Sequence, residues 1–211
     1  QFEWDDTMGF DLGHMIRSFI SRTKRANRNA DGEIKIYQLW ADHTYRAFET
    51  KDKHGYKAFC FEGKPVGNWS EVELFPSAHY TENGKAVGDV YPVEVSAVVV
   101  SEKCYKLIAP YIKGSVQVLN ARSQSEKLYV LNVTKVIDCL DKENSQLKLF
   151  PSSGRIMDIE KYVLYRDRLK DAFIFKIPEE VRTHPFVTNE FKKIIEQNGI
   201  KGFKFVPVWK G

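Results

Sequence analysis

Two segments, AVVVSEKCYKLIAPYIKGSVQVLN at residues 97–120 and HPFVTNEFKKIIEQNGIKGFKFVP at residues 184–207, align with each other without a gap. Each segment reads as a short apolar strand, an amphipathic helix of about three turns and a second strand. Ser101 and Thr188 stand where the helices are expected to begin, and Gly114 and Gly202 stand where they are expected to stop. The repeated pattern predicts an internal strand–helix–strand duplication whose helices cover a sheet.

Outside these segments the sequence predicts mainly strands. Alternating or β-branched runs occur at residues 34–39, 45–49, 56–61, 71–74, 128–134, 147–150 and 173–177. The run at 128–134 carries apolar side chains on both faces, which is typical of a central strand. The predicted fold class is therefore α+β, with a large, mainly antiparallel sheet and a few covering helices.

Residues 1–31 differ in pattern from the rest of the chain. Apolar side chains recur at helical spacing over residues 12–23, and a basic cluster follows at residues 22–28. This cluster either complements the dipole of the helix end or binds a phosphate or another acid. We predict two parts: residues 1–60, a helix and a strand meander packed on the main domain, and residues 61–211, the α+β domain.

The composition narrows the classes of protein to consider. A hydrophobic share of 43% is enough for a well-buried core. The net charge of +4 arises from 32 basic and 28 acidic residues, a mixed surface that disfavours nucleic-acid binding. Cys60, Cys104 and Cys139 have no paired spacing, which indicates a reducing cytoplasm, and no apolar run is long enough to cross a membrane.

A search for catalytic motifs finds none of the common ones. The nucleophile elbow, the phosphate-binding and dinucleotide-binding glycine loops and the zinc-binding helix motif are all missing from the sequence. The five histidines are scattered, so that no pair lies at helical spacing for a metal. We therefore predict a protein without catalytic residues, cofactor or metal.

Two features are candidates for binding. Asp138, Asp141 and Glu143 lie close together in a polar connection, where they form a turn cap, an acidic patch that faces a partner, or an acid–base pair. Trp69 follows Gly67 in a loop, and exposed tryptophan is a frequent anchor at protein interfaces. We predict these four residues as partner-binding.

The order of short motifs then shows a resemblance to a known family. The motifs are VVVSEK (98–103), YVLNVT (129–134), IDCLD (137–141), FIFKIP (173–178), FVTNEFK (186–192) and GIKGFKF (199–205). The series resembles a bacterial family, once a domain of unknown function, that was later assigned as immunity proteins of polymorphic toxin systems. The resemblance covers about Trp69 to Trp209, and its shared residues are strand and helix-start positions.

Members of that family are encoded beside a toxin and protect the cell by binding it. The resemblance therefore implies a cytoplasmic, non-enzymatic inhibitor whose partner is a cognate toxin domain. The expected mechanism is steric occlusion of the toxin's active site over roughly 1,200–2,000 Å² of interface. Residues 1–60 lie outside the resemblance and are expected to hold the specificity for the toxin.

Two alternatives stay open from the sequence. The chain is an enzyme that reverses the toxin's modification of its target, which requires a cleft with converging ionisable groups of shifted pKa. Otherwise it is a nucleic-acid or ligand-binding module that uses the basic cluster at residues 22–28 and nearby aromatic side chains.

Overall fold

The computed structural model describes residues 32–51, 59–77, 86–93, 97–124 and 126–211. The chain divides into two units, Gln1–Gly32 and Glu33–Gly211. The helix predicted at residues 12–23 and the basic cluster at residues 22–28 lie outside the described residues. All described helices and strands belong to the second unit.

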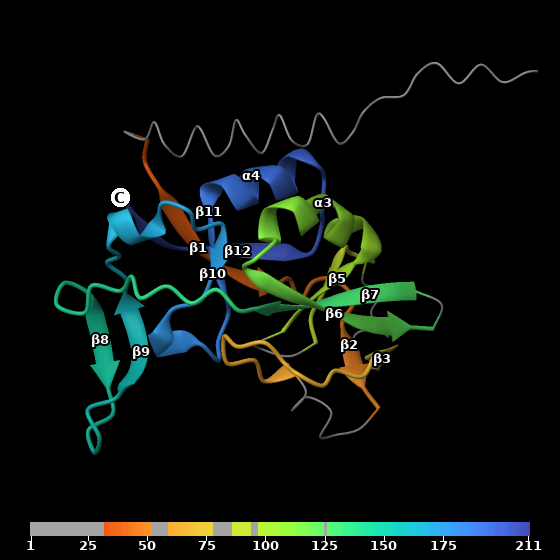
Figure 1. Ribbon diagram of the computed structural model, residues 1–211, viewed down its shortest axis with the longest axis horizontal. Helices are drawn as coiled ribbons and strands as arrows, with labels where there is room; N and C mark the ends of the chain where they lie inside the picture. Colours follow the sequence, from red (N-terminus) through yellow and green to blue (C-terminus); the bar gives the residue numbers. More distant parts are fainter. Residues whose placement is uncertain (1–31, 52–58, 78–85, 94–96, 125) are drawn as a thin grey trace, which may run out of the picture. The chain divides into compact units, whose positions relative to one another are not determined.

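The described strands form two sheets and a hairpin (Figure 1). The four-stranded sheet has the order β10 (Ile174–Phe175), β11 (Phe186–Thr188), β1 (Lys35–Ala41) and β12 (Phe203–Lys210). The six-stranded sheet has the order β2 (Phe48–Thr50), β3 (Val72–Pro76), β6 (Val116–Ser123), β7 (Glu126–Val133), β5 (Val98–Ser101) and β4 (Val90–Tyr91). The hairpin pairs β8 (Gln146–Leu149) with β9 (Ile156–Lys161).

The α+β class is confirmed, but the strands form two sheets where one large sheet was expected. Their pairing is antiparallel except between β3 and β6. The two sheets approach each other at β4 and the start of β12, where the Asp89 N–H donates to the Lys201 carbonyl at 2.7 Å. Strand β4 is two residues long and is followed by Pro92, which has no N–H to extend a ladder. The sheets therefore meet at a seam without merging.

Both aligned segments form the strand–helix–strand unit that the sequence predicted. Helix α3 (Glu102–Ile112) joins β5 to β6, and helix α4 (Asn189–Gln197) joins β11 to β12. In each unit the two joined strands flank a third strand that is antiparallel to both, β7 in the first and β1 in the second. The local arrangement is thus the same twice, while the duplication itself stays a prediction.

The two helices begin at the predicted residues, with different caps. The Ser101 hydroxyl accepts a hydrogen bond from the Cys104 N–H at 3.2 Å, which satisfies one of the free amides at the helix start. Thr188 occupies the same position before α4, but its hydroxyl makes no capping bond and is buried without a partner. Both residues therefore occupy the predicted helix-start positions, and of the two only Ser101 caps its helix through the side chain.

The predicted stop of the second helix is also wrong. Helix α4 is ended by Gly199, at φ +61°, and not by Gly202. The Gly199 N–H donates to the Glu196 carbonyl and the Ile200 N–H to the Ile195 carbonyl, each at 3.2 Å. This is the bonding pattern of a glycine-terminated helix. Gly202 instead lies at the seam, against Val90.

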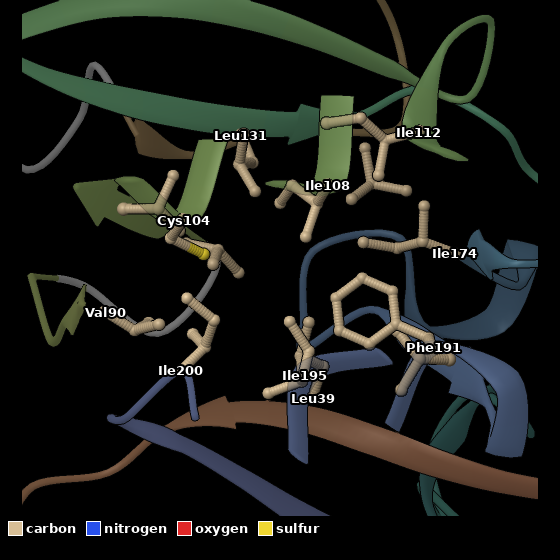
Figure 2. Close-up of a cluster of buried hydrophobic side chains, with 14 of the residues drawn as sticks. Leu39, Val90, Cys104, Ile108, Ile112, Leu131, Ile174, Phe191, Ile195 and Ile200 are labelled. Atoms are coloured by element: carbon tan, nitrogen blue, oxygen red, sulfur yellow. The ribbon is translucent and has the colours of Figure 1, made fainter. Parts of the chain in front are cut away.

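Three clusters of buried side chains hold these layers together. The first cluster packs α3 and α4 against one face of each sheet, and Figure 2 shows its residues from both helices and both sheets converging. The second cluster covers the other face of the four-stranded sheet with residues from 137–172. The third covers the other face of the six-stranded sheet and includes Phe59, Phe61 and Trp69. Each sheet is therefore covered on both faces, by the helices on one face and by the second or third cluster on the other.

The predicted central strand is confirmed, whereas the described part of the strand predicted at 56–61 is not in a strand. In β7, Leu128 and Val130 belong to the third cluster and Leu131 to the first, so both faces of this strand are buried. Of the strand predicted at 56–61, only 59–61 is described, and these residues are not in a strand. Phe59 and Phe61 contribute to the third cluster through their side chains.

Candidate functional site

The acidic connection after β7 is held by backbone pairing. The Asp141 N–H donates to the Val163 carbonyl at 2.9 Å, and the Tyr165 N–H donates to the Cys139 carbonyl at 2.8 Å. Between these bonds Leu140 forms a β-bridge with Leu164. Residues 138–144, named here the acidic loop, are therefore supported by the extended segment at residues 163–165.

Asp141 shapes the acidic loop from within. Its carboxylate is buried and accepts hydrogen bonds from the side chain of Asn144 at 2.7 Å and from the N–H groups of Glu143 and Asn144 at 3.1 Å each. The bond from the Asn144 side chain, followed by those from the two backbone amides, lowers the pKa of Asp141. Asp141 therefore caps the turn at residues 142–144, one of the interpretations open from the sequence.

Asp138 and Glu143 instead point their charge to the surface. Asp138 is exposed and forms an ion pair with Arg168 at 3.5 Å. Lys142 forms an ion pair with Glu179 at 2.8 Å, while the exposed Glu143 carboxylate makes no ion pair with any other described residue. An exposed pair such as that of Asp138 contributes little to stability, so both carboxylates are available to a partner.

Trp69 lies with a different cluster from the acidic loop. Its ring packs edge-on against Phe59, with ring centroids 6.1 Å apart, and its indole N–H donates to the Asn120 carbonyl at 2.8 Å. The ring is half-buried and belongs to the third cluster, whereas Cys139 and Leu140 of the acidic loop belong to the second. The structure thus brings the three acidic residues together and places Trp69 apart from them.

An exposed apolar group on the β8–β9 hairpin was missed by sequence reasoning. Leu149, Phe150 and Met157 are exposed there, directly after the acidic loop in the chain. The sequence predicted the strand at 147–150 but not which of its side chains would stay in contact with water. The available signal was Phe150 immediately before the turn-forming run Pro151 to Gly154.

A second missed group consists of ionisable side chains that are buried or half-buried. Lys176 is 1% exposed, and its ammonium group donates to the Val181 carbonyl at 2.6 Å. Desolvation lowers the pKa of Lys176 to about 8. His184 stacks on Trp40 with ring centroids 4.0 Å apart. Its pKa is lowered to about 4, first by desolvation and then by the charges of Lys176 and His43.

The same group includes a hydrogen-bonded chain of three residues. Gln38 donates to the Tyr162 hydroxyl at 3.0 Å, and this hydroxyl donates to Glu180 at 2.8 Å. Burial raises the pKa of both Tyr162 and Glu180. The enzyme alternative requires ionisable groups of shifted pKa that face a substrate. Here Tyr162 and Glu180 are hydrogen-bonded to each other, and Lys176 is buried out of reach of a substrate. We interpret the group as part of the packing.

The described part of the chain also bears on metal and membrane sites. It contains no group of three or more His, Cys, Asp and Glu side chains that could hold a metal ion. None of its helices has the length and apolar content needed to span a bilayer.

The half-buried His184 predicts a pH dependence of stability. Because the pKa of His184 is lowered from 6.5 to about 4 by folding, the unfolded state takes up the proton first as the pH falls. The stabilisation is full above pH 6.5 and decreases between pH 6.5 and 4. We expect H184Q to reduce the loss of unfolding free energy between pH 7 and pH 5 by roughly 1–2 kcal/mol, measured by urea unfolding. Identical losses in both proteins would contradict this assignment.

Comparison with known families decides the class of protein. The family described as Immunity protein family (Imm11) matches residues 29–210. The chain belongs to this family. No curated protein matches the chain.

The Imm11 match confirms the resemblance stated from the motifs and extends it. The resemblance covered about Trp69 to Trp209, whereas the match begins at residue 29. Strand β1 and the segment up to residue 60 therefore lie inside the Imm11 region. The acidic loop, the β8–β9 hairpin and the buried ionisable group lie inside it as well.

Proposed function

We propose that this Imm11 protein acts in the cytoplasm by binding a cognate toxin domain and covering its active site, without catalysis of its own. The observation that carries the proposal is the Imm11 match over residues 29–210. The free thiols of Cys104 and Cys139, both buried, fit a reducing compartment.

The acidic loop is the proposed contact surface. Backbone pairing with residues 163–165 and the cap formed by Asp141 hold the loop in one conformation before any partner arrives. A preformed loop avoids part of the entropy cost of ordering an interface. Asp138 and Glu143 are the proposed contact residues, and Asp141 positions them. Trp69 is a further proposed contact, through the exposed part of its ring.

The charge of this surface indicates the kind of toxin surface it fits. The chain carries a net charge of +4, yet the acidic loop contains three carboxylates and one lysine, Lys142, which is paired with Glu179. Complementary potentials accelerate association and select the partner. The toxin surface that meets the loop is therefore basic, as in a cleft that binds phosphate groups.

Co-expression tests the proposed function directly. The toxin domain encoded by the neighbouring gene should stop growth alone, should be tolerated when this protein is co-expressed, and should co-purify with it in a fixed stoichiometry. If the neighbouring product is not toxic, or if toxicity persists despite a folded partner, the proposal fails.

Charge reversal in the acidic loop tests the contact surface. We expect the double variant D138K/E143K to slow association with the toxin domain by about tenfold or more, because two attractive charges become repulsive. Surface plasmon resonance at low and high salt measures the rate. The control is E49K, which reverses an exposed carboxylate on β2 and should leave association nearly unchanged. Equal rates for both variants would place the contact elsewhere.

A further inference from the structure

We infer that the outer half of the β8–β9 hairpin is the anchor of the complex and inserts into a concave apolar site on the toxin domain. The inference rests on the proposed function and names the element that enters the partner. Leu149, Phe150 and Met157 are its contact side chains.

The hairpin is fixed at its base and projects at its tip. Leu147 and Ile159 are directly paired across the strands, and they pack on the second cluster. Beyond them come the Leu149–Ile156 pair and then the turn, which is closed by a bond from the Phe150 N–H to the Arg155 carbonyl at 2.9 Å. Figure 1 shows the turn end of β8–β9 extending away from both sheets.

Apolar exposure is concentrated at this outer half. Six large apolar side chains of the described residues are strongly exposed, and three of them are Leu149 (48%), Phe150 (43%) and Met157 (43%). The strand register skips Met157, so that this residue is the extra one of a β-bulge opposite Leu149. Bulges redirect side chains and recur at functional positions. Exposed apolar side chains gathered in one place mark an interaction site.

The two faces of the hairpin indicate which partner it fits, a concave site on another protein or a second copy of the chain. Lys148 pairs with Asp158 across the strands on the face opposite Leu147, and both are exposed. Two hairpins laid together by their apolar faces would bury three exposed side chains each, well short of the roughly 800 Å² per partner of a stable interface. A concave site surrounds the hairpin and buries both faces. The toxin domain is therefore the occupant that fits.

Continuity with the acidic loop supports the same occupant. The loop ends at residue 144, and β8 begins at Gln146, so the proposed contacts form one stretch of chain. Apolar anchors at the centre with charged groups at the rim are the usual composition of a protein interface. An element that fills a cleft also explains inhibition by occlusion.

The test compares hairpin variants with a matched control. We expect F150A/M157A, and separately L149S, to lower the affinity for the purified toxin domain of the neighbouring gene by about 100-fold or more, measured by calorimetry. Their melting temperatures should stay close to that of the wild type, because the altered side chains are exposed. The control V87A removes an apolar side chain that is 54% exposed elsewhere and should bind like the wild type.

The outcomes separate this inference from the proposed function. If the wild type does not bind the toxin domain, the proposed function fails. If the wild type binds and the hairpin variants bind equally well, the anchor is overturned while the proposed function stands. If the wild type alone is a dimer by light scattering and F150A/M157A is a monomer, the hairpin contacts a second copy, which also overturns the anchor.

Discussion

Replacing Gly202 with alanine should lower the free energy of unfolding by about 3 kcal/mol or more, the larger of the two glycine effects in the repeated units. Gly202 has φ +104°, a backbone conformation that residues with a side chain rarely adopt. A Cβ atom there would lie 2.6 Å from the Val90 carbonyl oxygen, at the seam between the sheets. Backbone atoms at this seam have little freedom to move, so the strain of the positive φ and the steric overlap with Val90 both lower the stability. Urea unfolding measures the change.

The control is Gly114, the glycine that follows α3 in the first unit. Gly114 has φ +80°, but a Cβ atom there would meet no other atom within 4 Å. G114A should therefore cost only the strain of a positive φ, about 1 kcal/mol. Equal losses for G202A and G114A would show that the seam yields and that backbone contact at Val90 is not limiting.

Replacing Phe191 with alanine should destabilise the fold by about 3–5 kcal/mol. Phe191 is 1% exposed and belongs, with Ile195, to the residues that α4 contributes to the first cluster (Figure 2). Its ring meets those of Phe173, Phe203 and Phe205 at centroid distances of 5.3, 5.8 and 6.3 Å. Truncation loses these contacts and leaves a cavity between α4 and the four-stranded sheet.

A surface residue of the same helix provides the control. Lys193 is exposed on α4, and K193A should change the free energy of unfolding by less than about 0.5 kcal/mol. Denaturant unfolding followed by tryptophan fluorescence reports on both variants. A loss for F191A below about 1 kcal/mol would mean that the cluster repacks around the missing ring.

These two predictions affect how binding variants are interpreted. A loss of about 3 kcal/mol raises the unfolded fraction more than a hundredfold and lowers the abundance of the protein in cells. G202A and F191A are therefore expected to weaken protection without touching the proposed interface. The hairpin and acidic-loop variants differ from them because they change exposed side chains, so affinity and stability can be measured separately.

Features encoded by neighbours along the chain were predicted well. The cap at Ser101 depends on a hydroxyl three residues before an amide, and β7 was recognised from apolar residues at consecutive positions. The acidic loop was found because its three carboxylates lie within six residues of one another. Such features require only local geometry, which sequence spacing reports directly.

Features that depend on distant partners were missed. Two glycines follow α4 within a few residues, and only the bonds of Gly199 to the helix and the contact of Gly202 with Val90 assign their roles. Phe59 and Phe61 have a strand-like pattern, but their side chains pack on a sheet formed by other segments. Pattern alone does not distinguish backbone pairing from side-chain packing.

The candidate site shows the same division. His184 is half-buried because the segment before β11 packs on Trp40 of β1, far earlier in the chain, and the buried Lys176 lies close enough to influence its pKa. The exposure of Leu149, Phe150 and Met157 depends on where the second cluster ends along the hairpin.

The amino-acid sequence by itself determined the two strand–helix–strand units, the α+β class and membership of the immunity family, because each depends on residue order and spacing within short segments. Only the tertiary structure decided the division into two sheets, the partner of each glycine and which carboxylates and apolar side chains reach the surface. The physical reason is that burial is a property of the whole folded chain: whether a side chain meets water depends on segments that lie far away in the sequence.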